Sequence, residues 1–230
     1  MVGQNKIFIN ENILPAGSFA LWLRQIRKAL TRNRVMNVSC GECDACCRSS
    51  YFIHINPEET RTLSRIPNEL LFPAPLRPEG HMVLGYDEQG RCPMLIGNTC
   101  SIYRNRPTTC RIFDCRVLAA SGLTGVDDEN NPIFQQARRW QFNYPTKRDR
   151  NLFSAIQAAA TFLRRHPECV QKNLVPMDAV QISIAAIKVY DVFLKAKNPS
   201  VETRTTTRDS KISKEIITLY KKFEKRMRAA

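Results

Sequence analysis

The sequence is poor in the residues that build nucleotide-binding loops. Only nine of its 230 residues are glycine. It contains no P-loop, no G-x-G-x-x-G stretch and no H-E-x-x-H motif, each of which places particular residues around a phosphate or a metal. The C-x3-C-x2-C triplet of radical-chemistry enzymes does not occur either. The sequence therefore gives no support to a Rossmann-type methyltransferase or to a nucleotide-dependent enzyme.

Long apolar runs are missing as well. A membrane-spanning helix needs a run of about 18 or more apolar residues, and the sequence has none. The plan of a signal peptide is also absent, because the apolar stretch 19–23 runs into Arg24, Arg27 and Lys28. We therefore expect a cytoplasmic protein without a transmembrane segment. In that compartment thiols stay reduced, so clustered cysteines are expected to be ligands rather than disulfides.

What the sequence does have is cysteine in two tight groups. Thiolates are soft, charged donors that suit zinc and iron–sulfur clusters. Eight of the nine cysteines belong to the groups, and we predict that all eight are metal ligands: Cys40, Cys43, Cys46, Cys47, Cys92, Cys100, Cys110 and Cys115. Cys169 stands alone and is expected to be an ordinary thiol.

The cysteine spacing leaves three ligand arrangements open. In the first, Cys40, Cys43 and Cys46 hold a [4Fe–4S] cluster together with Cys92, which precedes a proline as the remote ligand of ferredoxins does. In the second, the eight cysteines build two four-thiolate zinc sites. In the third, Cys46 and the adjacent Cys47 bridge two metals, because neighbouring thiolates cannot easily serve one tetrahedral ion together.

Four arginines lie among the cysteines of the second group: Arg104, Arg106, Arg111 and Arg116. Hydrogen bonds from such donors commonly support metal-bound thiolates from outside the ligand set. We expect this role above all for Arg106 and Arg111, in preference to the binding of an anionic substrate.

The positive charge of the chain is concentrated at its two ends. The formal net charge is +14. Residues 1–39 contain six basic and one acidic side chain, and residues 204–230 contain nine basic and three acidic ones. Basic ends suggest contact with an acidic partner such as nucleic acid or an anionic surface, with solubility as the simpler interpretation.

Apolar periodicity predicts four regions along the chain. The first is a basic N-terminal extension, 1–39, with an amphipathic helix over 18–34. A cysteine-cluster metal-binding domain follows at 40–145. The third region, 146–199, contains a helical pair over 149–165 and 177–197 that packs on this domain. The last, 200–230, is a linker to about residue 210 and a basic helix over 211–228.

Several elements are also predicted inside the cysteine domain. They are a strand over 51–55, a helix that begins at Asn56 and ends near Pro67, a hairpin that runs from His81 through a turn at 87–90 and delivers Cys92, and a helix from Asn131 through Trp140 and Tyr144. Together these elements predict an α+β fold, mostly helical, with a short hairpin and irregular loops around a cysteine–metal centre. Metal binding would then replace part of a conventional core.

Residues 40–116 resemble the bacterial CxxCxxCC cysteine-cluster family, a zinc- or iron-chelating domain. The resemblance rests on the first cysteine group, on Cys92-Pro-x-Leu, and on the stretch Cys100-Ser-Ile-Tyr-x-x-Arg-Pro-x-x-Cys-Arg-x-Phe-x-Cys115. It implies metal chelation. A similar cysteine-rich region occurs in flagellin lysine N-methylases, which adds an enzymatic alternative.

Three functions follow from these observations. The leading one is a metal-binding protein with an iron–sulfur cluster or zinc on Cys40, Cys43, Cys46 and Cys92. The second is a protein-modifying enzyme such as a lysine N-methyltransferase, which rests on the resemblance alone. The third is a zinc-scaffolded nucleic-acid-binding protein whose basic ends grip phosphates.

Overall fold

The computed structural model describes residues 13–32, 36, 38, 42–75, 77–124, 130–170, 177–195 and 206–228. Its α-helices are α1 (Phe19–Arg32), α2 (Thr60–Leu63), α3 (Thr108–Ile112), α4 (Arg116–Ser121), α5 (Pro132–Arg138), α6 (Lys147–Arg165), α7 (Ala179–Val189), α8 (Asp191–Lys195) and α9 (Thr206–Arg228). Its strands are β1 (Leu14–Ser18), β2 (Ile53–Ile55), β3 (Leu71–Pro73), β4 (Met82–Leu84), β5 (Leu95–Ile96), β6 (Thr99–Cys100) and β7 (Trp140–Asn143). Short 3-10 helices are η1 (Ala45–Arg48), η2 (Asn68–Leu70), η3 (Tyr103–Asn105) and η4 (Pro167–Cys169). The predicted α+β, mostly helical class is confirmed.

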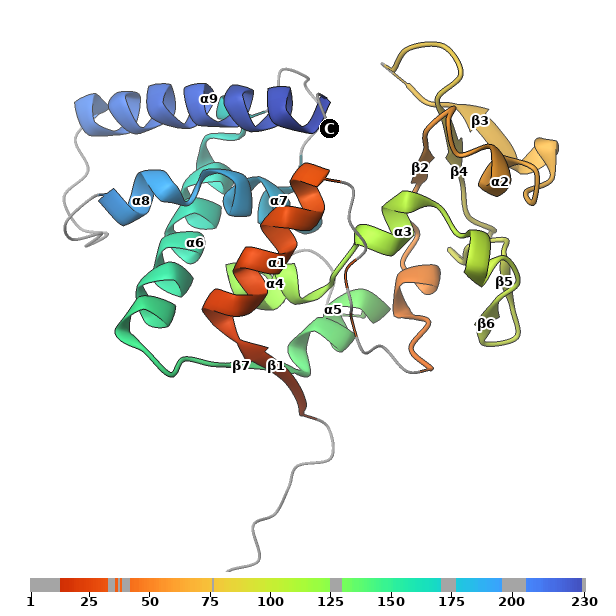
Figure 1. Cartoon of the computed structure of the whole chain (residues 1–230), viewed down its shortest axis with the longest axis horizontal. Helices are drawn as coiled ribbons and strands as arrows, with labels where there is room; N and C mark the ends of the chain where they lie inside the picture. Colours follow the sequence, from red (N-terminus) through yellow and green to blue (C-terminus); the bar gives the residue numbers. More distant parts are fainter. Residues whose placement is uncertain are drawn as a thin grey trace, which may run out of the picture.

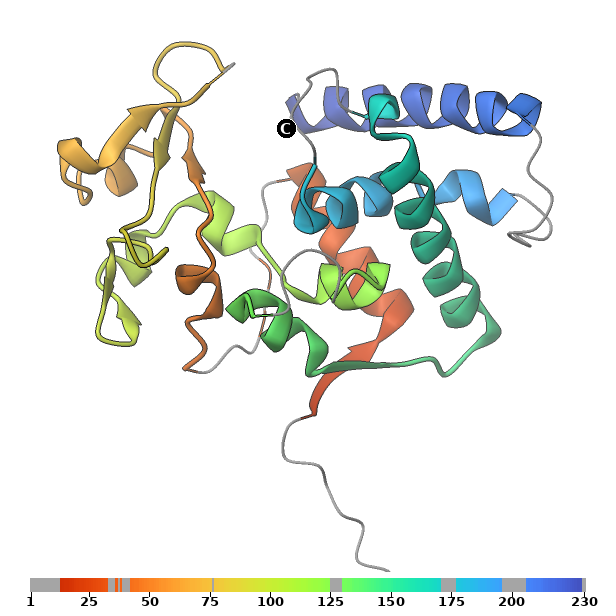
Figure 2. The same ribbon diagram turned by 180° about the vertical axis from the view of Figure 1, so that it is seen from behind.

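The elements form two lobes (Figure 1). The cysteine lobe, residues 42–112, contains β2 to β6 with α2 and α3. The helical lobe contains β1, β7 and the longer helices, and it is built from both ends of the chain (Figures 1 and 2). Each lobe has its own cluster of buried apolar side chains. The cysteine lobe is therefore an insertion between α1 and the later helices.

The apolar face of α1 organises the helical lobe. Phe19, Trp22, Leu23 and Ile26 recur at helical spacing, and each is at most 2% exposed. This face packs on α6 and α7, which also pack on each other and on α4. Full burial of such side chains is worth roughly 1.5–3 kcal/mol each, so this contact holds the N-terminal segment on the lobe.

A parallel pair of strands closes the helical lobe, and the sequence analysis missed it. Strand β1 pairs with β7, with Leu14 opposite Trp140 and Gly17 opposite Phe142. The helix predicted through Trp140 and Tyr144 is wrong beyond Arg138, where α5 ends. Burial alternates along β7, with Trp140 and Phe142 inside. This period of two suits a strand, and β1 supplies its backbone partners.

The predicted hairpin over 81–92 is also wrong in its pairing. The turn at 87–90 forms, because the Asp87 carboxylate accepts the backbone N–H groups of Gln89 and Arg91. However, β4 pairs with β2 and β3 in an antiparallel sheet of order β2-β4-β3. The short hairpin lies later, where β5 and β6 pair around Gly97. Gly97 has φ +61°, a conformation that favours glycine at such a turn.

The remaining helices follow the sequence pattern with shifted ends. The helix predicted over 149–165 is confirmed as α6, whose Thr146 cap and Asp149 form a capping box. The helix predicted over 177–197 is divided at Tyr190 into α7 and α8. Helix α9 begins at Thr206, so the end of the predicted linker is helical, while 196–205 lie outside the described residues. None of the described helices is long and apolar enough to cross a bilayer.

Among the described residues, hydrogen bonds join the lobes at two places, around Ser49 and at Arg111. The Ser49 hydroxyl, just after η1, accepts the backbone N–H of Ile133 at the start of α5, at 3.1 Å. The Met36 backbone N–H donates to the Arg111 carbonyl at 3.0 Å. Helix α3 also packs against α1. The cysteine lobe is thus fixed to the helical lobe from two sides.

Asp149 ties the starts of α1 and α6 together, and its titration gives a testable pH dependence. The carboxylate accepts hydrogen bonds from Thr146, from the Ala20 backbone and from the Ser18 hydroxyl, and these bonds lower the Asp149 pKa to about 2. A lowered folded-state pKa stabilises the fold above the usual aspartate pKa, and this stabilisation is lost as pH falls through the folded value. We expect Asp149→Asn to lower the urea midpoint at pH 6. The difference from wild type should shrink between about pH 4 and pH 2; a constant difference would contradict this role.

Candidate metal centre

Four thiols from four separate segments lie close enough in the cysteine lobe for their charges to interact. Cys47 lies in η1, Cys92 follows the 87–90 turn, Cys100 lies in β6 and Cys110 in α3. All four are partly buried. The charge of the Cys47 thiolate acts on the Cys110 pKa, as do the charges of Cys92 and Cys100. We call these four the inner thiols.

Backbone hydrogen bonds fix three of the inner thiols relative to one another. The Cys92 N–H donates to the Cys47 carbonyl at 2.7 Å. Cys100 stands opposite Leu95 in the β5–β6 pair, and the Leu95 N–H donates to the Cys92 carbonyl at 2.9 Å. The Met94 amide donates to the Cys92 sulfur, which stabilises the thiolate form. Such N–H···S bonds support metal-bound thiolates.

Arg48 fastens η1 to the β5–β6 hairpin. Its Nε donates to Asp44 at 2.6 Å and its Nη2 donates to the Asn98 side chain at 3.0 Å. These bonds hold the neighbouring Cys47 beside Cys100. The sequence analysis did not single out Arg48, although the i, i+4 spacing of Asp44 and Arg48 in the first cysteine group is a usable signal.

Glu59 positions the fourth inner thiol. Its carboxylate accepts the backbone N–H of Thr108, at the start of α3, at 2.6 Å, and also the N–H of Asn56 at 3.0 Å. Thr109 donates its hydroxyl to the His54 carbonyl at 2.7 Å. Cys110 is thereby held against β2. The bond between Thr108 and Glu59 joins residues 49 positions apart, so no local sequence pattern predicts it.

Burial and the charges of neighbouring thiolates raise the pKa of Cys47, Cys92 and Cys110 and make these thiols poor acids. Burial, with the charges of Cys92, Cys100, Asp44 and Cys43, raises the pKa of Cys47 to about 12. Burial and the other inner thiols raise the pKa of Cys110 to about 12, against the opposing influence of Arg106. Several thiolates at one place therefore require a compensating positive charge. A metal cation supplies that charge and displaces the thiol protons as it binds.

The first cysteine group is only partly gathered at this place. Cys43 and Cys46 are both exposed, and the charge of Cys43 acts on the Cys47 pKa. Cys40 lies outside the described residues. Within the described ranges, no three histidine, cysteine, aspartate or glutamate side chains are arranged so that they could hold a metal ion as they stand. The inner thiols are thus neighbours that must draw together, or be joined by Cys40, to ligate one.

Cys115 lies apart from the inner thiols, in the core of the helical lobe. It is 5% exposed and accepts a hydrogen bond from Trp140 Nε1 at 3.2 Å. Arg116 forms an ion pair there with Asp114, with Nη2 and Oδ2 2.8 Å apart.

The two arginines expected to support the metal differ in their contacts. The Arg106 guanidinium lies over the Tyr103 ring, and its charge lowers the Cys110 pKa. The Arg111 carbonyl accepts the backbone N–H of Met36. Of the two arginines expected to support the metal, Arg106 is the one whose charge acts on an inner thiol.

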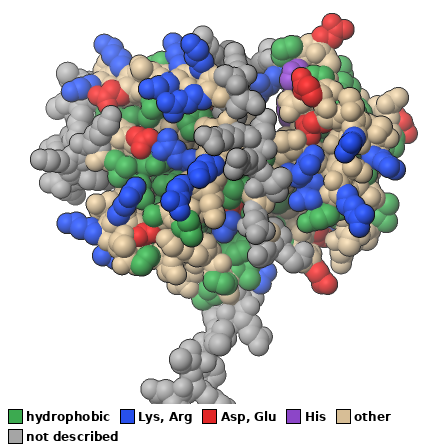
Figure 3. Space-filling model, in the orientation of Figure 1, with side chains coloured by type: hydrophobic (Ala, Val, Ile, Leu, Met, Phe, Trp, Pro, Cys, Tyr) green, Lys and Arg blue, Asp and Glu red, His purple; other side chains and the backbone are tan. Residues whose placement is uncertain are grey.

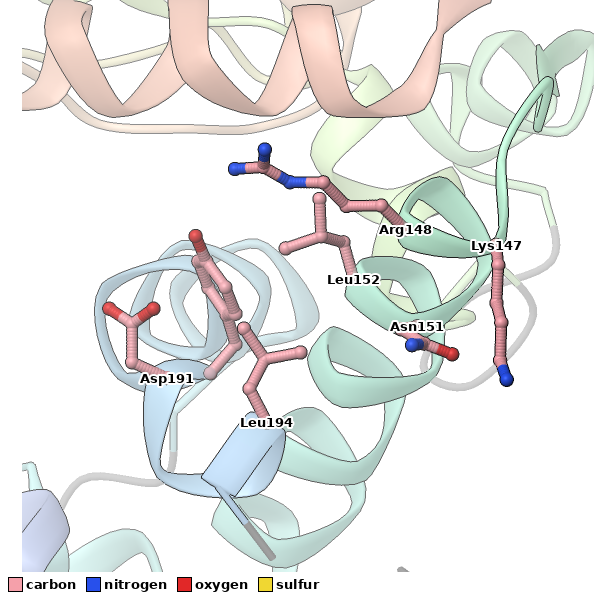
Figure 4. A pocket seen from close by; sticks show the side chains of 7 residues that line it. Lys147, Arg148, Asn151, Leu152, Asp191 and Leu194 are labelled. Atoms are coloured by element: carbon pink, nitrogen blue, oxygen red, sulfur yellow. The ribbon is translucent and has the colours of Figure 1, made fainter. Parts of the chain in front are cut away.

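A pocket in the helical lobe is unrelated to the cysteines. Figure 4 shows it between the start of α6 and α8. Its lining residues are Lys147, Arg148, Asn151, Leu152, Tyr190, Asp191 and Leu194. Arg27 Nη1 donates hydrogen bonds to the Tyr190 hydroxyl at 2.7 Å and to the Asp191 carboxylate at 3.0 Å. The pocket wall is therefore part of the contact between α1 and α8.

Comparison with known proteins gives a family match to the region that contains these cysteines. Residues 39–138 match the model of the family described as "CxxCxxCC: Putative zinc- or iron-chelating domain". The match includes both cysteine groups and extends through α5. Searches of curated proteins and of solved structures gave no significant match.

Proposed function

We propose that this chain, whose residues 39–138 match a zinc- or iron-chelating family, holds its metal at the four inner thiols. The observation that supports the proposal is the convergence of Cys47, Cys92, Cys100 and Cys110 from four segments. Four thiolates suit tetrahedral zinc or an iron–sulfur centre. Cys40, Cys43 and Cys46 remain predicted ligands.

The small core of the cysteine lobe gives the metal a structural task. Five buried apolar residues form its cluster: Ile55, Ile66, Leu84, Met94 and Ile102. Cys92 and Cys100 pack directly against this cluster. Units with so little core usually need a disulfide or a metal to be stable. The bound metal would supply a four-point cross-link, and the chain's own residues would orient the thiols: Arg48 for η1 and Glu59 for α3.

Metal and acid-labile sulfide analysis of protein purified without oxygen tests the proposal. We expect zinc or iron bound in a stable ratio to the chain, because closed thiolate sites release metal slowly and only with proton uptake. Sulfide and a visible absorption band would identify an iron–sulfur cluster, and colourless protein with zinc would identify a zinc site. Protein that folds fully without either metal would contradict the proposal.

Two further features stay predictions. Lysine N-methyltransferase activity rests on the resemblance of the cysteine region alone, and binding of S-adenosylmethionine to the metal-loaded protein tests it. A cytoplasmic location is proposed because the inner thiols need a reducing compartment to remain available to metal.

A further inference from the structure

The outer face of α9 carries five exposed lysines. Helix α9 buries Ile216 and Phe223, at 0% and 4% exposure, against the helical lobe. The opposite side carries the lysines, which we call the lysine face: Lys211, Lys214, Lys221, Lys222 and Lys225. From the first to the last the face measures about 21 Å, at 1.5 Å of rise per residue. Figure 3 shows basic side chains gathered along the edge where α9 runs.

The acidic residues of α9 do little to neutralise this face. Glu224 points inward to Lys188 of α7, with Oε1 and Nζ 2.5 Å apart. Lys188 is 7% exposed and also lies over the Tyr220 ring at 4.9 Å. Asp209 lies at the start of the helix near His166, and Glu215 is the one exposed acid of α9 among the described residues. Glu224 thus holds α9 against α7, and the exposed side of α9 keeps its lysines with little acidic charge beside them.

The lysines have no internal partner. Within the part of the chain that the structure describes, none of the five lies within ion-pair distance of a carboxylate. Neighbouring α1 adds Arg24 and Lys28, both exposed. Like charges held on a rigid helix attract counter-anions from solution, and a polyanion that replaces those ions gains binding free energy.

We propose that the lysine face binds the phosphate backbone of a double-stranded nucleic acid. Lysine ammonium groups are compact point charges that contact phosphates without reading bases. Over 21 Å a duplex presents phosphates along about six base-pair steps. An anionic membrane fits less well, because the large exposed apolar side chains of the described residues lie outside α9. This inference is independent of the metal at the inner thiols.

Fluorescence anisotropy with a labelled duplex DNA of roughly 20 base pairs and mixed sequence tests the proposal on the full, metal-loaded chain. We expect log K to fall with log salt at a slope of about −4, from four to five phosphate contacts. The triple variant Lys214→Gln, Lys221→Gln and Lys225→Gln should reduce the slope to about −1. Its circular dichroism and melting temperature should match wild type, because the three side chains are exposed.

A matched control separates a defined surface from net charge. Arg61→Gln, Arg65→Gln and Arg77→Gln remove the same charge from exposed positions of the cysteine lobe and should leave the slope unchanged. An equal loss in this control, or a flat salt response of the wild type, would overturn the proposal. Tighter binding to vesicles of phosphatidylserine and phosphatidylcholine than to the duplex would overturn it in favour of a membrane.

Discussion

Replacing Cys110 by serine is expected to remove the metal and unfold the cysteine lobe. Cys110 is held by α3 among the other inner thiols, and a serine hydroxyl does not replace a thiolate as a soft ligand. Loss of a residue that merely supports a ligand costs about 10- to 100-fold in metal affinity, so loss of a ligand should cost more than about 100-fold. Metal content after gel filtration and near-ultraviolet circular dichroism measure the two effects.

Two other cysteines provide the controls. Cys169 is buried in the helical lobe at 4% exposure, and Cys169→Ser should keep the full metal content. Cys115→Ser should also keep it, because the serine oxygen can accept the Trp140 Nε1 hydrogen bond that the sulfur accepts now. Metal loss from Cys115→Ser would support the sequence-based prediction that Cys115 is a ligand. Retention of metal by Cys110→Ser would remove Cys110 from the ligand set.

The second large effect is expected at Asp114. Its carboxylate is fully buried and accepts hydrogen bonds from Trp22 Nε1 at 2.8 Å and from the Arg116 guanidinium at 2.8–3.0 Å. Asp114→Ala would leave the Arg116 charge buried without its partner, which typically costs about 3–5 kcal/mol of folding stability. Urea unfolding followed by tryptophan fluorescence measures the loss, because Trp22 is one of the only two tryptophans.

A double variant shows whether the buried charge is the cause. Asp114→Ala with Arg116→Met removes both charges and should recover a large part of the loss, since apolar replacements of a buried pair are often neutral. Arg91→Ala breaks an exposed pair with Asp87 but keeps the backbone hydrogen bonds of the 87–90 turn. It should change stability little, because such pairs are screened by water. If the double variant is no more stable than the single one, the cost arises from packing instead.

The sequence alone predicts the long helices and the metal-binding character of the chain well. Local patterns determine α6, whose apolar period and capping box lie within one segment. They also determine the apolar period of α1, although its first turn is bound by Asp149 of α6. The strands β1 and β7 were missed because their pairing joins residues 14–18 to 140–143, and no local pattern reports such a partner. Pairing with β1 also places Trp140 in a strand, although its position in the sequence fits a helical period equally well.

The cysteine spacing identifies a thiolate site but not which thiols meet. The tight spacing of Cys40, Cys43 and Cys46 favours them as one ligand set, which stays a prediction. Among the described residues, thiols from η1, β6, α3 and the segment after the 87–90 turn lie near one another. Cys115 belongs by spacing to the second group, yet α4 carries it into the other lobe. Cysteine spacing gives only the separation along the chain. The positions of α3 and of the β5–β6 hairpin determine which cysteines are near one another in space.

The pairing of β1 with β7 imposes an order of events during synthesis. All eight clustered cysteines lie between the two strands, so they leave the ribosome before β7 exists. The loop that this pairing closes contains about 120 residues, and ordering the inserted lobe first shortens the flexible chain that must be closed. A metal that orders the inserted lobe would therefore favour the later closure of the helical lobe. In metal-starved cells, the nascent chain would reach its last helices with its middle still unfolded.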